Sequence, residues 1–386
     1  MKQIKQKPMF QYLMVLTIAS AAGLQSWRTL FNNFAVETVK LDGLHISMIQ
    51  SIREIPGFLA LCVIFLLVFI KEQRISALSV ICMGIGIVLT GFMPTFNGLI
   101  ITTLLMSFGF HYYETTNQSL ILQNFDEYQS PLVMGSQRSM MSLVSIIVGI
   151  CVFLMAYGLS FKTMFSIIGM IIISTGIWGL FSGPKQNKEQ VQHKKMVLRK
   201  KYSLFYYLTF LSGARRQIFM VFSILLLVKK FDFSVQQITM LFVLNNIINY
   251  FAAPLIAKAI KKFGERTILS CEYGSLIFIF TAYAFCPYKW MVATFYVLDH
   301  ISFNGSMAIR TYFQKIANKQ DISSSTAVSF TINHIAAVIL PVVGGYLWMI
   351  NYRIPFLFGT FMGLLSLIVV QFMPRAKARK RSALNL

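Results

Sequence analysis

The stretch GPKQNKEQVQHKKMVLRKKYS, residues 183–203, divides the chain into two halves. It is polar and carries seven lysine and arginine residues, whereas long apolar runs dominate the sequence on either side. Six runs precede it and six follow it, each long enough for a helix to cross about 30 Å of hydrocarbon. We therefore expect an all-α integral membrane protein of twelve transmembrane helices. The expected parts are a six-helix bundle over residues 1–182, a basic cytoplasmic linker over 183–203, and a six-helix bundle with a basic tail over 204–386.

The positive charges indicate how the chain crosses the bilayer. Counted together with the adjoining ends of the runs, the two ends of the chain and the gaps after even-numbered runs hold 23 of the 35 lysine and arginine residues, and the other gaps hold six. Because lysine and arginine are enriched in cytoplasmic loops, we expect a multi-pass protein of the cell inner membrane with both termini in the cytoplasm. The runs cover residues 9–36, 45–70, 75–94, 97–123, 131–157, 161–181, 204–228, 236–260, 266–288, 290–316, 323–350 and 353–374.

The composition excludes several other classes of protein. With 56% hydrophobic and 12% charged residues, the chain is too apolar for a soluble protein. Its net charge of +22 follows membrane boundaries, so we expect no nucleic-acid partner. The five cysteines form no CxxC pair, and we expect neither a disulfide framework, a metal nor a cofactor. The expected partners are the lipid bilayer and a small-molecule substrate, and we expect a monomer.

The two halves repeat one plan. At an offset of 192 residues, several positions of the first half match positions of the second, which suggests a duplicated six-helix unit. Many secondary transporters are built this way, with the substrate site near the membrane midplane between the repeats. The matches are Leu16-Thr17 with Leu208-Thr209, Ser20 with Ser212, and Arg74 with Arg266.

With this layout the whole chain resembles the major facilitator superfamily. The loop signature of that family, Gly-x-x-x-Asp-Arg-x-Gly-Arg-Arg, is reduced here to KEQR at residues 71–74 and is better kept as KKFGER at residues 261–266. Its antiporter signature, Gly-Pro-x-x-Gly-Gly, is absent from the fifth run and has its nearest match at residues 340–345 in the eleventh. The resemblance implies two pseudo-symmetric bundles and transport by alternating access.

Ionisable side chains inside the apolar runs are the candidates for function, because burying a charge in a bilayer is costly. Arginines outnumber acids among them, which favours an anionic solute. Guanidinium groups bind carboxylate and phosphate with two parallel hydrogen bonds. The arginines are Arg28, Arg53, Arg138, Arg215, Arg216 and Arg310, and the other groups are Glu54, Glu114, Asp299, His111, His300 and His334.

Helical spacing groups these residues. Gln25, Arg28 and Asn32 share one face, which we interpret as a packed polar seam, a substrate contact or a gate. Arg215 and Arg216 point about 100° apart, so one is expected to face a cavity while the other packs between helices. Asp299 and Arg310, eleven residues apart, are expected to share a face.

The fourth run places His111 and Glu114 on one stripe. This spacing is compatible with a structural hydrogen bond, with proton or substrate handling, and weakly with a pair of metal ligands. Asp299 and His300 form a second pair, in which each ionisable group could shift the pKa of the other toward neutral pH. We also expect Glu114 and Arg138 to pair in a cytoplasmic gate.

These groups predict three sets of site residues. The substrate-binding candidates are Arg28, Arg215, Arg216, Asn304 and His334. The proton-coupling candidates are Glu114, Asp299, His300 and His111. The gating candidates are Arg53, Glu54, Arg138 and Arg310.

The function expected from all this is a secondary active transporter, not an enzyme. It would move a small anionic organic solute across the inner membrane by alternating access, coupled to protons. No Gly-x-x-x-x-Gly-Lys-Ser/Thr loop occurs in the sequence, so the chain itself does not bind ATP in that way. The alternatives are an exporter of drug-like or siderophore-like compounds, an intramembrane enzyme using the embedded acids and histidines, and a receptor derived from a transporter.

Overall fold

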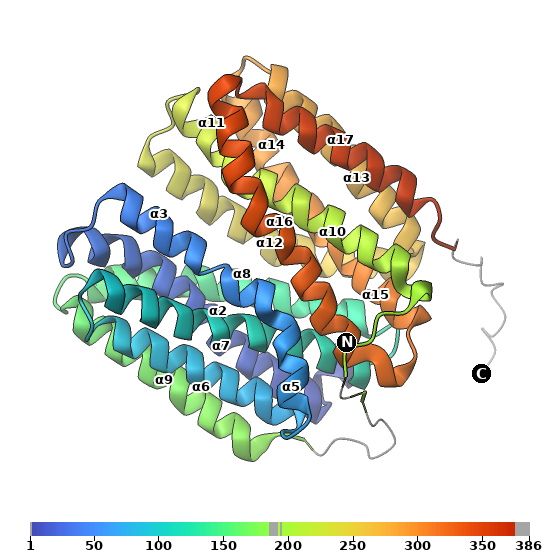
Figure 1. The fold of residues 1–386 in the computed structure, drawn as a ribbon, viewed down its shortest axis with the longest axis horizontal. Helices are drawn as coiled ribbons and strands as arrows, with labels where there is room; N and C mark the ends of the chain where they lie inside the picture. Colours follow the sequence, from blue (N-terminus) through green and yellow to red (C-terminus); the bar gives the residue numbers. More distant parts are fainter. Residues whose placement is uncertain (1, 185–191, 194, 375–386) are drawn as a thin grey trace.

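The computed structural model describes residues 2–184, 192–193 and 195–374, and in these ranges the fold is made of helices and turns. Figure 1 shows the helices of the first half, coloured blue to green, beside those of the second half, coloured yellow to red. A short α1 (Lys2–Lys5) precedes twelve spans in the described ranges.

The spans fall at the predicted positions, several of them as broken helices. In the first half they are α2 (Pro8–Glu37), α3 (Gly43–Ile52) continued by α4 (Ile55–Phe58), η1 (Leu59–Cys62) and α5 (Val63–Leu67), α6 (Glu72–Thr90), α7 (Phe96–Asn124), α8 (Ser130–Met155) and α9 (Phe161–Ser182). After η2 (Lys200–Tyr202) they are α10 (Ser203–Ile218) continued by η3 (Phe219–Ser223) and α11 (Ile224–Lys229), α12 (Val235–Phe263), α13 (Glu265–Phe285), α14 (Lys289–Ser302) continued by η4 (Phe303–Ser306) and α15 (Met307–Ile316), and, after η5 (Lys319–Asp321), α16 (Ile322–Ile350) and α17 (Arg353–Val370).

Helix packing repeats between the halves. The first span of each half packs against its fifth and sixth spans: α2 against α8 and α9, and α10 against α16 and α17. The third span of each half packs against the sixth, α6 against α9 and α13 against α17. Equivalent helices therefore have equivalent neighbours, which supports the predicted pair of six-helix bundles.

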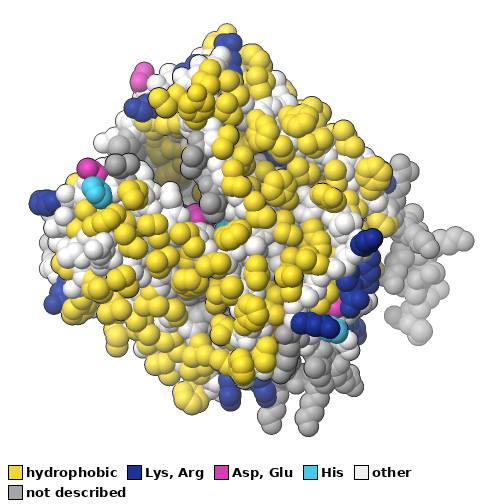
Figure 2. Space-filling view, in the orientation of Figure 1, with side chains coloured by type: hydrophobic (Ala, Val, Ile, Leu, Met, Phe, Trp, Pro, Cys, Tyr) yellow, Lys and Arg dark blue, Asp and Glu magenta, His cyan; other side chains and the backbone are white. Residues whose placement is uncertain are grey.

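Hydropathy distinguishes eight of the spans from the others. Among the described residues, eight spans are long and apolar enough to cross a membrane by length and composition. Of the others, α2, α7 and the α14–η4–α15 run carry arginine, glutamate, histidine and amide side chains that lower their hydropathy. The surface in Figure 2 is mostly hydrophobic, with lysine and arginine gathered toward the two ends of the molecule. This pattern is typical of a protein whose flanks face lipid.

Hydrogen bonds between the halves gather at the end where the linker lies, which we call the linker end. Ser323 of α16 donates to Glu72 at 2.7 Å and accepts from Gln123 at 2.9 Å. Gln314 of α15 donates to the carbonyl oxygens of Leu122 and Phe125, at 2.8 and 2.6 Å. The opposite end, between α3 and α11, is hollowed in Figure 2. The structure is thus closed at the linker end and open at the far end.

The close crossing of α8 and α12 depends on a glycine and a proline. A Cβ atom on Gly135 would lie 2.6 Å from the Cβ of Ala257 and 2.9 Å from the carbonyl oxygen of Ala253, so a larger residue would push the halves apart. Pro254 inside α12 has no N–H, which leaves the carbonyl of Tyr250 without its helical donor. Ser139 of α8 donates to that carbonyl at 2.6 Å and joins the halves there.

The end of the linker is fixed to the second half. Arg199 donates from Nε and Nη2 to the two carboxylate oxygens of Asp321, at 2.6 and 3.1 Å, and the Tyr202 hydroxyl donates to the same carboxylate at 2.6 Å. Burial alone would raise the pKa of Asp321, but the bonds from Arg199 and Tyr202 outweigh it and lower that pKa.

A lowered carboxyl pKa predicts a pH-dependent stability. The contribution of Asp321 should be present above the ordinary pKa of an aspartate, about 3.9, and should be lost as the pH falls through its folded-state pKa. We expect Asp321→Asn to lower the melting temperature of the purified protein by a few degrees at pH 7, and the difference from wild type to shrink toward pH 3. A constant difference across this range would contradict the assignment.

Candidate functional site

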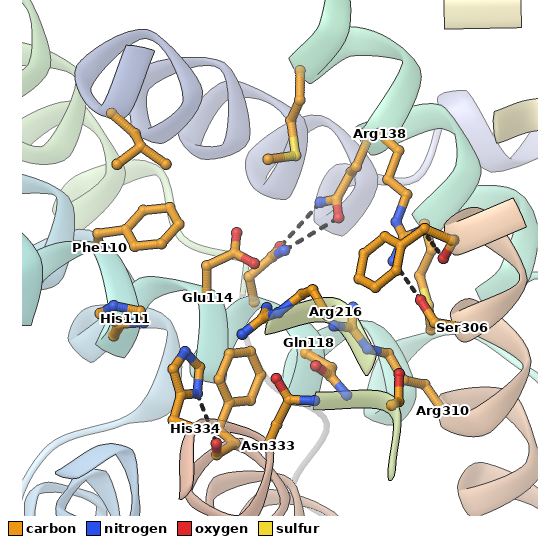
Figure 3. Close-up of a pocket in the computed structure, with 18 of the residues that line it drawn as sticks. Phe110, His111, Glu114, Gln118, Arg138, Arg216, Ser306, Arg310, Asn333 and His334 are labelled. Carbon is orange, nitrogen blue, oxygen red and sulfur yellow. Dashed lines mark hydrogen bonds between the residues drawn. The ribbon is translucent and has the colours of Figure 1, made fainter. Parts of the chain in front are cut away.

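A cavity of about 480 Å³ lies between the two halves, with walls from both of them. The first half contributes side chains from α2, α7 and α8, and the second contributes side chains from α10, α12, α15 and α16. This volume is typical of a pocket for a small molecule. Figure 3 shows Glu114, Arg216 and Arg310 pointing into one space, with His111 and His334 beside it.

The cavity is strongly cationic. Its walls carry five arginines and two glutamates among the described residues, in addition to His111, His300 and His334. The glutamates are Glu54 and Glu114 and the arginines are Arg28, Arg53, Arg138, Arg216 and Arg310. Even with both glutamates ionised, an excess of positive charge faces the space in which a solute would sit.

Three of the arginines keep free hydrogen-bond donors. Within the part of the chain that the structure describes, the guanidinium groups of Arg28, Arg216 and Arg310 make neither a hydrogen bond nor an ion pair with other side chains or carbonyls. Electrostatic interactions connect Arg216 with Glu54 and Glu114 and connect Arg310 with Glu114. Each of these arginines offers up to five N–H donors, which an oxyanion could accept.

Two other cavity arginines are already bound to protein groups. Arg53 donates from Nη2 to Oε1 of Glu54 at 2.6 Å and lies 5.6 Å from the ring of Trp27. Arg138 of α8 donates across the halves, to the carbonyl of Phe303 and to Asn304 and Ser306 at 3.1 to 3.3 Å. The predicted direct pair between Arg138 and Glu114 does not form, because Arg138 is directed toward η4 and interacts with Glu114 only through space.

Arg215 lies outside the cavity. It is only 3% exposed, its Nη1 is 3.6 Å from Oε1 of Glu272, and its guanidinium is 4.2 Å from the ring centre of Tyr273. Arg216, the next residue, lines the cavity. The 100° between neighbouring side chains thus separates the two arginines, and Arg215 does not line the cavity in this conformation.

Asp299 is also outside the cavity, 3% exposed, although Arg310 lines it. The expected shared face assumed an unbroken α-helix. Instead, the 3-10 turn η4 lies between the two residues and changes the helical register. His300 lines the cavity and contacts Asn245 and the carbonyl of Tyr296 through Nδ1, at 3.2 and 3.1 Å, so it does not pair with Asp299.

The remaining predicted residues lie on the cavity wall. Asn304 donates to Asn249 at 2.6 Å and accepts from Arg138, which fixes its amide. His111 and His334 have ring centres 4.9 Å apart, and both lie near Glu54. Of thirteen candidates only Arg215 and Asp299 lie away from the wall. Their assigned roles stay predictions, because a position on the wall does not by itself give a role.

Sequence reasoning missed several polar residues of the site. Asn117 and Gln137 exchange two amide hydrogen bonds, at 3.1 and 3.0 Å, on the cavity wall. Glu72 was assigned to a degraded loop signature, yet it is buried and holds Gln123 and Ser323 together across the halves. Its charge at the first residue of a span was the available signal. The partner Ser323, 251 residues away, gave none.

Comparison with known proteins agrees with this architecture. The sequence profile described as "Major Facilitator Superfamily" matches residues 13–309 and 205–385. The chain belongs to the major facilitator superfamily. Members of this family are transporters and not enzymes, so the predicted class is confirmed. No curated protein matches the chain significantly.

Solved structures of low sequence identity share the fold of this superfamily member. A bacterial homologue of the iron transporter ferroportin, in an outward-facing state, is 14% identical with a TM-score of 0.75, over 94% of this chain and 98% of the other. The human organic anion transporter MFSD10 (TETRAN) is 9% identical with a TM-score of 0.74, over 94% and 99%. The transporter FucP in the outward conformation, from E. coli, is 12% identical with a TM-score of 0.75, over 96% and 100%.

Proposed function

We propose that the protein is a secondary active transporter of a small anionic organic solute. The observation that supports this most is the set of free guanidinium donors of Arg28, Arg216 and Arg310 on one cavity between the two halves. A charge-assisted bond to carboxylate or phosphate is stronger than a neutral hydrogen bond. A cationic solute would instead meet an excess of like charge.

The asymmetry of the two ends supports transport by alternating access. The cavity opens toward the far end and is closed at the linker end by bonds such as Ser323 to Glu72 and Gln314 to Leu122. Side-chain bonds of this kind can exchange for water when the halves rock. The solute site would then open toward the linker end as the far end closes.

The charge pattern supports a cytoplasmic linker end, and this orientation can be tested directly. We expect single cysteines at Lys40 and Lys162 to react with a membrane-impermeant thiol reagent in intact cells, in a background without the five native cysteines. A cysteine at Lys262 should react only after the membrane is permeabilised. Labelling of the Lys262 position in intact cells would contradict this orientation.

Arg216→Gln tests the anion assignment. Removing one charge-assisted contact should cost about 1.5 to 3 kcal/mol, or roughly ten- to a hundredfold in affinity. The measurement is thermal stabilisation of purified protein by a panel of carboxylates and organic phosphates, because a ligand that binds the folded state raises its stability.

Arg215→Gln is the matched control, since it changes the neighbouring arginine, which lies outside the cavity beside Glu272. We expect it to lower the melting temperature, because it leaves Glu272 buried without its partner. It should leave the ligand-induced shift unchanged. If Arg216→Gln keeps wild-type affinity for every anion that stabilises the wild type, the anion assignment is wrong.

Proton coupling is proposed at Glu114. Its carboxyl interacts with Arg310, Arg138 and Arg216, and it makes no hydrogen bond to the other residues that the structure describes. When ionised, Glu114 neutralises part of the positive field that a solute anion needs. When protonated, it leaves that field to the solute, so proton and anion would bind together.

Glu114→Gln should mimic the protonated carboxyl. In the wild type, anion affinity should rise as the pH falls, whereas the variant should bind with high affinity at all pH values. In proteoliposomes we expect the variant to exchange labelled solute but to lose uphill accumulation driven by a proton gradient. Accumulation that survives a proton uncoupler, or that requires sodium, would exclude this coupling while leaving the transporter assignment intact.

A further inference from the structure

Glu54, His111 and His334 meet on the cavity wall. Each offers one ligand atom, and the three atoms lie within 4.8 Å of one another. Glu54 is the residue before α4, His111 is on α7 and His334 is on α16, so the sequence places them 57 to 280 residues apart. Only the fold brings them together.

The imidazole ring of His334 is held by a hydrogen bond that leaves its other nitrogen available to a metal. Nδ1 of His334 is 2.8 Å from the carbonyl oxygen of Phe330. Because a carbonyl oxygen can only accept, Nδ1 carries the N–H of the neutral ring, and Nε2 keeps a free lone pair. The ring of Phe330 stacks on His334 with 15° between the planes. His111 is only 6% exposed, and its ring makes no hydrogen bond to other residues that the structure describes.

Gly57 leaves room for these rings. A Cβ atom at this position would lie 2.7 Å from Nε2 of His334 and 2.9 Å from Cε1 of His111. Both distances are too short for ordinary contacts. The two rings therefore converge where the α4 backbone carries no side chain.

We propose that Glu54, His111 and His334 bind a divalent transition-metal ion. Two imidazoles and a carboxylate are a common ligand set for zinc and for iron, cobalt and nickel. Metal–ligand bonds of about 2.1 Å place tetrahedral ligands about 3.4 Å apart, so side-chain shifts of about 1 Å would close the site. The fourth position faces the cavity and stays open to water or to a solute.

The surrounding charges limit the affinity of this site. Arg53 holds one oxygen of Glu54, and Arg216 interacts electrostatically with both histidines and with Glu54. These positive charges oppose a dication, so we expect micromolar and not nanomolar binding.

The site exists in one conformation of the carrier. Glu54 and His111 belong to the first half and His334 to the second. Near them, Thr331 of α16 donates to the carbonyl of Phe58 at 2.8 Å and accepts from the N–H of Leu61 at 3.0 Å, which holds the same helices together. When the halves separate at the linker end, the three ligands move apart and the metal is released.

The test is titration of purified protein with Co²⁺ and Zn²⁺ in a chelator-free buffer, measured by calorimetry and by the visible absorption of bound Co²⁺. We expect one saturable site per chain. His111→Gln and His334→Gln should each weaken binding at least about tenfold, and the double variant should bind no metal at the site, because ligand number sets affinity. His300→Gln is the matched control, since it changes a histidine of the same cavity that lies outside the cluster.

A second variant tests the geometry of the site without removing any ligand. Gly57→Ala retains all three ligands but should push the rings apart, and we expect it to weaken Co²⁺ binding and change its absorption spectrum. Absence of saturable binding to the wild type overturns the proposal. Binding that survives the double histidine variant in a folded, monodisperse protein overturns it too. Metal alone is the probe, so the outcome does not depend on the anion assignment.

Discussion

A charged side chain in a membrane has to face water or an opposite charge, and this constraint organises the interior of the protein. The six arginines inside the spans meet it in three ways. Arg53 and Arg215 are each paired with a glutamate, and Arg138 donates its hydrogen bonds to the other half. Arg28, Arg216 and Arg310 face the cavity without such partners. These three arginines therefore need the cavity for their own solvation, because without it three guanidinium groups would be buried without partners. The same space is the site for a solute.

The same polar groups define how the halves are joined. At the closed end the halves are joined through serine, glutamine and free backbone carbonyls, such as that of Tyr250 below Pro254, beside apolar contacts that run through both halves. Water can replace each of these bonds at small cost, since the net contribution of a hydrogen bond to stability is only about 1 kcal/mol. An interface built in this way can be specific in the closed state and still separate on the time scale of transport.

Much of the fold could be predicted from the sequence, because apolar length and the distribution of lysine and arginine are local signals. The split between Arg215 and Arg216 also follows from local helix geometry. The prediction that Asp299 and Arg310 share a helical face was wrong for a local reason, since the 3-10 turn Phe303–Ser306 has no clear mark in the sequence. The convergence of Glu54, His111 and His334 could not be predicted, because it depends on how three distant helices cross.

The fastening of the linker to Asp321 also bears on where the chain can be cut. Gln192, His193 and Arg199 all bind residues just before α16, so the last part of the linker travels with the second half. A cut before Gln192 therefore leaves this part of the linker with the second half. A second-half fragment that begins upstream of Gln192 would keep all of these anchoring contacts, so this is the place to divide the chain into a split carrier.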